Sequence, residues 1–175
     1  MTSPKLPRRI PTVVTFLEMK ARPSAIPPQP RGKIALLRAH RPPVHFYRYL
    51  YDAIGREYYW VDRKKMSDAQ LAALLGEERL ELYVLYVDGC PAGMAELDFR
   101  DAAVANLAYF GLVPEYVGRR LGFFFLYHTS VNAWARPISK LLVNTCTLDH
   151  PRALPLYQRL GFVPYSREDR FIELL

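Results

Sequence analysis

The chain has 175 residues, of which 50% are hydrophobic and 23% are charged, enough for one compact domain with a core of its own. No apolar stretch approaches the ~18–20 residues that span a membrane, and the N-terminus lacks the basic, apolar and small-residue order of a secretory signal. Two cysteines, Cys90 and Cys146, cannot build a disulfide framework, and no Cys/His cluster has zinc-ligand spacing. We therefore expect a soluble, cytoplasmic protein without a bound metal.

The net charge of +7 is concentrated near the N-terminus. Residues 1–41 carry nine Lys or Arg and one acid, and nine of the 15 prolines lie within residues 1–43. We predict a flexible basic arm at residues 1–11 and a single domain at residues 12–175. A basic arm could bind nucleic acid or another polyanion, but a solvated extension is the commoner outcome of such a charge block, so nucleic acid is not the partner that we expect.

The hydrophobic pattern predicts the further elements in chain order. They are a strand at 12–19, a short apolar run at 34–38, helices at 44–54 and 67–76, strands at 82–87, 91–99 and 102–113, a helix at 121–136, a strand at 141–148, a helix at 154–160 and a last strand that starts at 162–165 and continues into 171–175. The run at 34–38 either pairs with the first strand or leads into a helix. A capping-box pattern starts at Ser67, and Asp88-Gly89 supplies a hairpin turn. This order predicts a mixed α/β domain with antiparallel and parallel pairs.

The most informative segment is a predicted strand, turn and helix within residues 104–136. The apolar strand reaches Val113, and a basic, glycine-bearing turn precedes the helix, which begins at Leu121. Backbone N–H groups at a helix start lack partners within the helix, and the helix dipole adds positive potential. Gly118 and Gly122 let a ligand approach the backbone closely. The turn therefore predicts an anion site, most naturally for a pyrophosphate, with a purely structural turn as an open alternative.

Two motifs in this part of the chain resemble the GCN5-related N-acetyltransferase (GNAT) superfamily. Residues 114–122, Pro-Glu-Tyr-Val-Gly-Arg-Arg-Leu-Gly, are similar to its acetyl-CoA pyrophosphate loop. Residues 153–162, with the pattern Ala-x-x-Leu-Tyr-x-x-x-Gly-Phe, are similar to its late helix, whose tyrosine lies near the thioester sulfur. The loop departs from the family pattern at Val117, which replaces a Gln or Arg, and at Arg120, which replaces the first glycine. The resemblance implies a central mixed, mostly antiparallel sheet of six or seven strands, splayed at its centre and flanked by about four helices.

The resemblance also implies an activity, the transfer of the acetyl group of acetyl-CoA to a primary amine by direct attack, with acetyl-CoA as co-substrate. Tyr157 is then expected to protonate the leaving thiolate, and a backbone N–H such as that of Leu112 to stabilise the developing oxyanion. The residues expected to contact the co-substrate are Phe110, Leu112, Val113, Val117, Gly118, Arg119, Arg120, Leu121, Gly122, Asn144, His150 and Tyr157. His150 stands where the family often has asparagine.

The base that takes the proton of the acceptor amine is the least determined part of this site. The strand at 104–113 contains no acid. Strand alternation places Glu96 and Asp98 on one face of the preceding strand, so they are the expected bases, directly or through water. A solvated sheet face would show the same pattern, and that alternative stays open. Glu115 and His150 are further candidates.

The acceptor pocket is expected at the first two helices and their connection, where aromatic side chains gather. They are Tyr47, Tyr51, Tyr58, Tyr59 and Trp60. Such a wall suits an organic cation, and it suits an ordinary core equally well. The resemblance implies a small-molecule or peptide amine as the acceptor, and it makes a homodimer plausible. Two other functions stay open, a non-catalytic acyl-CoA-binding domain and a polyanion-binding protein that works through residues 1–41.

Overall fold

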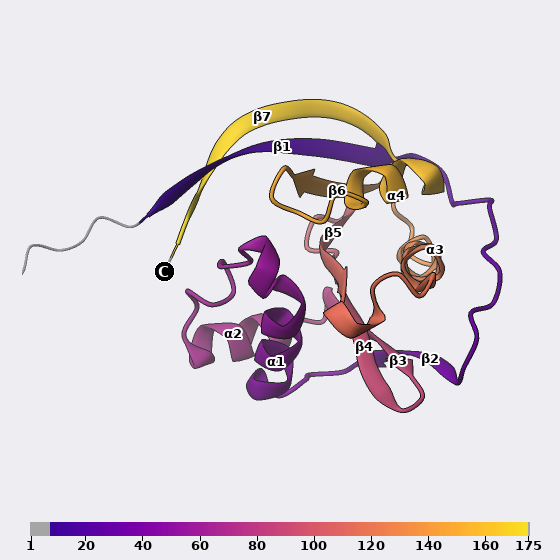
Figure 1. Ribbon diagram of the computed structural model, residues 1–175, viewed down its shortest axis with the longest axis horizontal. Helices are drawn as coiled ribbons and strands as arrows, with labels where there is room; N and C mark the ends of the chain where they lie inside the picture. Colours follow the sequence, from indigo (N-terminus) through magenta and orange to yellow (C-terminus); the bar gives the residue numbers. More distant parts are fainter. Residues whose placement is uncertain (1–7, 175) are drawn as a thin grey trace, which may run out of the picture.

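The computed structural model describes residues 8–174, which form one twisted sheet with helices on both of its faces (Figure 1). The strands are β1 (Arg9–Met19), β2 (Ile34–Ala39), β3 (Leu80–Val87), β4 (Cys90–Asp98), β5 (Val104–Leu112), β6 (Lys140–Cys146) and β7 (Val163–Glu173). The helices are α1 (Val44–Gly55), α2 (Asp68–Leu75), α3 (Leu121–Ala133) and α4 (Ala153–Leu160), with short 3-10 turns η1 (Arg56–Tyr58) and η2 (Pro114–Tyr116).

The order of strands in the sheet is β2-β3-β4-β5-β6-β1-β7. Every neighbouring pair is antiparallel except β5 and β6, which run parallel. The predicted mixed, mostly antiparallel sheet is therefore confirmed. Within residues 8–174, no helix is long and apolar enough to cross a bilayer.

Local sequence signals explain where several elements begin and end. The Ser67 hydroxyl accepts the Gln70 N–H, and the Gln70 side chain accepts the Ser67 N–H, so the predicted capping box starts α2. Asp88 and Gly89 have φ values of 50 and 86 and close the β3–β4 hairpin. The segment between β1 and β2 contains no helix or strand, as its prolines predict.

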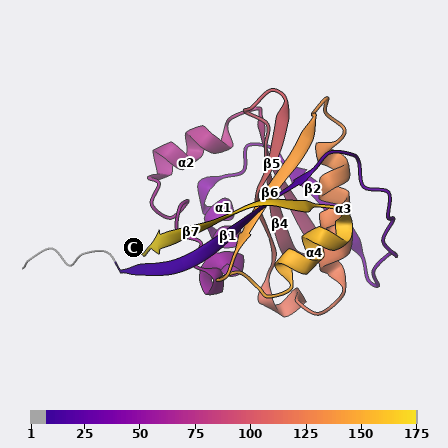
Figure 2. The same cartoon turned by 90° about the horizontal axis from the view of Figure 1, so that it is seen from above.

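The core has one cluster on each face of the sheet. Helices α1 and α2 cover one face, and α3 and α4 cover the other (Figure 2). On the first face Tyr47 and Ile54 pack with Met94 of β4, and on the second Phe125 packs with Leu97. Both faces of β4 are therefore buried.

The central strands diverge in the middle of the sheet. Pairing between β5 and β6 ends at Leu107 and Val143, although β5 continues to Leu112 beside β4 and β6 continues to Cys146 beside β1. The β4–β5 register also shifts at this point, because Leu97 pairs with Leu107 whereas the residue before it pairs with Tyr109. This bulge bends β5 away from β6, and the expected splay is confirmed.

Strand β1 starts earlier along the chain than predicted. β1 begins at Arg9, three residues before the predicted start, because it continues to pair with β7 as far as Glu173. Residues 9–11 of the expected arm thus belong to a strand, and residues 1–7 lie outside the described residues. The apolar run at 34–38 does not pair with the first strand, since β2 pairs with β3 at the opposite edge of the sheet, but it does lead into helix α1. Beyond β6, the first residues of β1 and the last residues of β7 form a two-stranded ribbon (Figure 1).

Candidate active site

A cavity of about 1180 Å³ opens where β5 and β6 diverge. Its walls come from the free edge of β5, the turn before α3 with the first residues of that helix, α4, and the connection between α1 and α2. The ribbon of β1 and β7 closes one side through Thr12, Val14 and residues 170–173. Two segments that are far apart in sequence therefore share this cavity with the predicted loop.

The turn before α3 presents free backbone donors to the cavity. Among the described residues, none accepts a hydrogen bond from the backbone N–H groups of residues 118–122. Gly118 has φ +83 and Arg120 has φ 60, so both have left-handed backbone. The arginine thus adopts a conformation usual for the glycine that it replaces, at a strain of ~1 kcal/mol. Such a row of unpaired amides, at the positive end of a 13-residue helix, fits an anion.

Three arginines add positive charge to this end of the cavity. Arg120, Arg152 and Arg159 line it, and none of them forms an ion pair within residues 8–174. The Arg159 guanidinium lies 4.1 Å from the centroid of the Phe123 ring, which fixes it beside the start of α3. A ligand with several phosphates would meet both the amides and these guanidinium groups.

The free edge of β5 offers further backbone groups. The Val113 N–H donates to the Ala92 carbonyl of β4 at 2.9 Å. Because N–H groups alternate between the two edges of a strand, those of Phe110 and Leu112 point away from β4, toward the gap left by β6. Both residues line the cavity, so their backbone groups can bind an extended amide-bearing chain laid along this edge.

Tyr157 on α4 reaches the same space from the α3 side. Its side chain is 5% exposed and lines the cavity, and its ring lies 6.3 Å from that of Phe110 and 5.9 Å from that of Phe162. Burial, and then the nearby Asp149 carboxylate, raises the pKa of Tyr157 above that of an ordinary phenol. The hydroxyl is therefore a neutral donor, and it has no hydrogen-bond partner among residues 8–174.

The end of β6 and the turn after it supply the other polar groups of the cavity. Asn144 and His150 line it, as expected, and Asp149 does so as well. The Nδ1 atom of His150 accepts the Arg152 N–H at 3.1 Å. The neutral imidazole therefore carries its proton on Nε2, and that tautomer has no free nitrogen that could act as a base.

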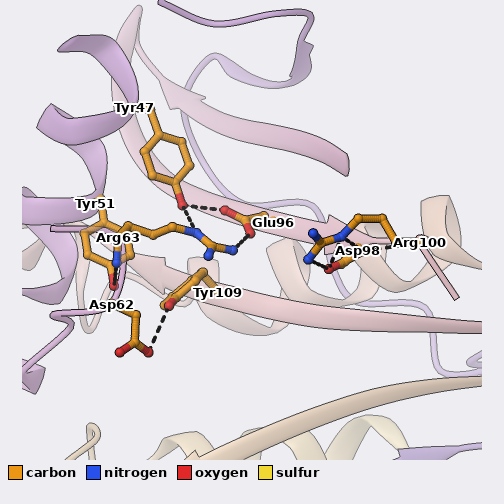
Figure 3. A network of polar contacts seen from close by, with 8 residues as sticks. All are labelled: Tyr47, Tyr51, Asp62, Arg63, Glu96, Asp98, Arg100 and Tyr109. Carbon is orange, nitrogen blue, oxygen red and sulfur yellow. Dashed lines mark hydrogen bonds and ion pairs between the residues drawn. The ribbon is translucent and has the colours of Figure 1, made fainter. Parts of the chain in front are cut away.

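Several expected residues lie outside the cavity. Val113 is buried against the α1 side of the sheet, and Arg119 stacks 5.0 Å from the centroid of the Tyr116 ring. Glu96 is 0% exposed and hydrogen-bonded, and Asp98 forms an ion pair with Arg100 at 2.6 Å (Figure 3).

The two carboxylates do share the α1 face of β4, as alternation predicts, but that face is covered by the helix. Neither of them lines the cavity. The alternative of a solvated face is also wrong for Glu96.

An aromatic wall closes the cavity opposite α4, and we use this name for Tyr51, Trp60 and Tyr109. Their ring centroids lie 5.0–5.3 Å apart, and all three line the cavity together with the expected Tyr58 and Tyr59. Tyr47, also expected here, is fully buried behind the wall.

Sequence reasoning missed Tyr109 and Asp62 as cavity residues. Tyr109 immediately precedes the expected Phe110, so its position on β5 was a signal that could have found it. Nothing local in the sequence marks Asp62. Within residues 8–174, no group of three or more His, Cys, Asp or Glu side chains is placed to hold a metal ion.

Comparison with known proteins agrees with this geometry. A GCN5-related N-acetyltransferase from Kribbella flavida has a TM-score of 0.65 at 16% identity, over 92% of this chain and 58% of that one. Another from Sphaerobacter thermophilus has a TM-score of 0.63 at 16% identity, over 96% and 54%. An aminoglycoside acetyltransferase from an uncultured soil metagenomic sample has a TM-score of 0.60 at 11% identity, over 73% and 87%. At these identities the likeness shows the fold.

The chain spans little more than half the length of the Kribbella and Sphaerobacter proteins. No curated protein matches its sequence. The model of the acetyltransferase (GNAT) family matches residues 47–162, which include most of α1, the splayed strands, the turn before α3 and Tyr157. That match extends over more than half of the 175 residues, so the chain belongs to the acetyltransferase (GNAT) family.

Proposed function

We propose that this protein transfers the acetyl group of acetyl-CoA to a primary amine by direct attack of the amine. One observation carries the proposal: a single cavity joins the turn of Gly118 and residues 120–122 with its free amides, the free edge of β5, the Tyr157 side chain and the aromatic wall. A donor bound along the first two parts and an acceptor bound at the wall would meet near Tyr157.

The residues of the cavity fit acetyl-CoA as co-substrate. The amides of residues 118–122, with Arg120, would hold its diphosphate. The backbone of Phe110 and Leu112 and the Asn144 side chain would bind the amides of the pantetheine arm. When bound, acetyl-CoA supplies an activated acetyl thioester. A chain entering between β5 and β6 would therefore place its reactive end in the middle of the sheet.

The protein's own groups would act at three atoms of the reaction. The amine nitrogen forms a bond to the acetyl carbon, and the bond from that carbon to sulfur breaks. The Leu112 N–H would donate to the carbonyl oxygen as negative charge develops on it. The attacking nitrogen would lose its extra proton to solvent as the amide forms, and the Tyr157 hydroxyl would give its proton to the leaving sulfur and regain one from solvent. Because a thiol has a pKa of ~8.5, the thiolate needs modest help, and the proton donor contributes less than the positioning of the donor and acceptor.

The ammonium form of the acceptor must lose a proton before attack, since an alkyl ammonium has a pKa of ~10.4. Glu96 and Asp98 lie outside the cavity, and the His150 tautomer offers no free nitrogen, so we assign the deprotonation to solvent. The rate at subsaturating acceptor should then rise about tenfold per pH unit up to the pKa of the amine. A plateau at much lower pH would instead show a protein base, and Asp62→Asn and Asp149→Asn, which change the two carboxylates that line the cavity near the wall and near Tyr157, would be the first variants to examine.

The experiment that tests the proposal combines binding with turnover. Calorimetric titration with acetyl-CoA and CoA measures the cavity's affinity for the co-substrate, and thiol release over a panel of amines, with mass spectrometry of the product, measures transfer. We expect saturable binding of acetyl-CoA and of CoA, and we expect an N-acetylated amine as the product. Binding without transfer to any amine would favour a non-catalytic acyl-CoA-binding domain, and absence of binding would refute both functions.

A further inference from the structure

A buried polar cluster supports the aromatic wall from behind (Figure 3). One carboxylate oxygen of Glu96 accepts the Arg63 guanidinium at 2.5 Å, and the other accepts the Tyr47 hydroxyl. The Arg63 Nε also donates to the Tyr47 oxygen at 3.3 Å. Burial, and then the Glu96 charge, raises the pKa of Tyr47 far above that of an ordinary phenol, so its hydroxyl stays a donor. Both oxygens of Glu96 are occupied from within the protein.

Arg63 connects this cluster to the wall. Its guanidinium lies 5.1 Å from the centroid of the Tyr109 ring, and its backbone N–H donates to the Tyr51 hydroxyl at 3.3 Å. Arg63 belongs to the connection between α1 and α2, which has no helix or strand of its own after η1. Glu96 therefore anchors an irregular segment to the sheet through one arginine, and that arginine contacts two of the three wall residues.

The third wall residue is held by close packing against backbone. A Cβ atom at Gly55 would overlap the Trp60 indole, and one at Gly111 would overlap Ile54 and lie 3.5 Å from the indole. Only glycine therefore leaves room for the ring at the end of α1. Trp60 packs on Tyr51 and Tyr109 at 5.3 and 5.0 Å, so the three rings form one fixed surface.

The charges around the wall favour an ammonium group at its edge. Glu96 neutralises Arg63 behind the rings, so the wall itself presents uncharged surface. An Asp62 oxygen lies 3.5 Å from the Tyr109 hydroxyl, and this carboxylate lines the cavity without an ion-pair partner in the described part of the chain. Lys65, three residues later, also lines the cavity and would repel a second cationic group.

We infer that the acceptor is a primary amine carried on a flat apolar body, which packs on Trp60 and Tyr109 while Asp62 receives its ammonium group. Arg63 and Glu96 are then positioning residues that hold the wall and contact no substrate. Linear polyamines are disfavoured because they bring a second charge beside Lys65 and no ring for the wall. This inference rests on the proposed function, since it names the acceptor class of the same cavity.

The binding test uses the intrinsic fluorescence of Trp60 in a Trp134→Phe background, where it is the remaining tryptophan. The probes are 2-phenylethylammonium, 2-phenylethanol, which lacks the charge, and n-butylammonium, which lacks the ring. We expect saturable quenching by the first probe and binding about tenfold weaker for each of the others, as a lost ion pair or a lost ring contact predicts. Asp62→Asn should abolish the preference for the ammonium over the alcohol.

A matched pair of variants tests the positioning role. Arg63→Met should weaken the binding of 2-phenylethylammonium about tenfold and raise its KM in the transfer assay, while leaving the Kd of acetyl-CoA unchanged. Arg100→Met removes an arginine from the Asp98 ion pair on the same strand face, away from the cavity, and should change neither value. If Arg63→Met fails to fold by circular dichroism, Arg63→Lys, which keeps the charge but not the planar contact with Tyr109, should show the same selective loss.

The inference and the proposed function can fail separately. Equal binding of the three probes, or no effect of Asp62→Asn and Arg63→Met on them, would overturn the acceptor class. Acetyl transfer to n-butylammonium or a linear polyamine with the same kcat/KM as to 2-phenylethylammonium would also overturn it, with the transferase function intact. Selective probe binding without an N-acetylated product would support the aromatic wall as the amine-binding surface and refute acetyl transfer.

Discussion

Replacing Gly118 by alanine separates the role of the turn before α3 from simple backbone strain. Gly118 has φ +83, and a Cβ atom added there would meet nothing within 4 Å, so the substitution creates no clash. Its effect is conformational, because an L-residue loses ~1 kcal/mol in the left-handed region relative to glycine. The free turn should therefore populate the binding conformation about fivefold less, and the Kd of acetyl-CoA should rise by the same factor.

Gly89 provides the matched control for this substitution. It has φ +86, a Cβ there would also meet nothing within 4 Å, and it lies in the β3–β4 hairpin away from the cavity. Gly89→Ala should lower the free energy of unfolding by the same ~1 kcal/mol without changing the Kd. The two variants thus carry equal strain at two sites.

Calorimetric titration with acetyl-CoA and urea unfolding of both variants complete the assay. The reasoning is refuted if Gly118→Ala binds acetyl-CoA like the wild type despite its lower stability, or if Gly89→Ala weakens binding equally. In the first case the turn would hold the same conformation in the free and the bound protein, so the strain would lower stability and leave the Kd unchanged. In the second, the loss of affinity would reflect general destabilisation.

Three further predictions concern the chemistry and the stability of the fold. Tyr157→Phe keeps the ring but loses the proton donor, so kcat in the thiol-release assay should fall about tenfold with the Kd of acetyl-CoA unchanged. Burial and the adjacent carboxylate raise the pKa of Tyr47 in the folded protein, whereas the phenol of the unfolded chain ionises near pH ~10. The free energy of unfolding should therefore be constant below that pH and fall above it by up to ~1.4 kcal/mol per pH unit for this group. Urea titrations of Tyr47→Phe should show a smaller fall over the same pH range. Gly55→Ala should destabilise by ~2 kcal/mol because its Cβ would overlap Trp60, whereas Gly122→Ala, whose Cβ would stay 3.6 Å or more from its neighbours, should change the urea midpoint little.

Local signals in the sequence predicted the part of the site that is local in the structure. The strand, turn and helix around Gly118 are contiguous, β6 supplies Asn144 to the cavity, and the motif that follows β6 supplies Tyr157. The capping box of α2 and the turn at Asp88 are equally local and were correct. In each case a few neighbouring residues determine the backbone conformation, so the pattern of those residues is sufficient to predict the local structure.

The position of β1 could not be predicted in this way. Its β-branched pattern indicates a strand but says nothing about its partners, and the two strands that flank it, β6 and β7, come more than a hundred residues later. β7 itself was expected in two pieces, because the charged residues 167–170 interrupt its apolar pattern. They are tolerated because this stretch pairs only with β1 and is exposed on both faces.

The same limitation applies to the surroundings of Glu96. Alternation correctly places it on one face of β4, but the charge of a carboxylate is available to a substrate only if no other group neutralises it. The two residues that do so, Tyr47 and Arg63, precede it by 49 and 33 residues and reach it from another layer of the fold. Leaving a buried carboxylate without its charge partner costs free energy, so the role of such a carboxylate depends on the partners that it binds. In this protein the pairing connects Glu96, through Arg63, to the Tyr109 ring of the wall.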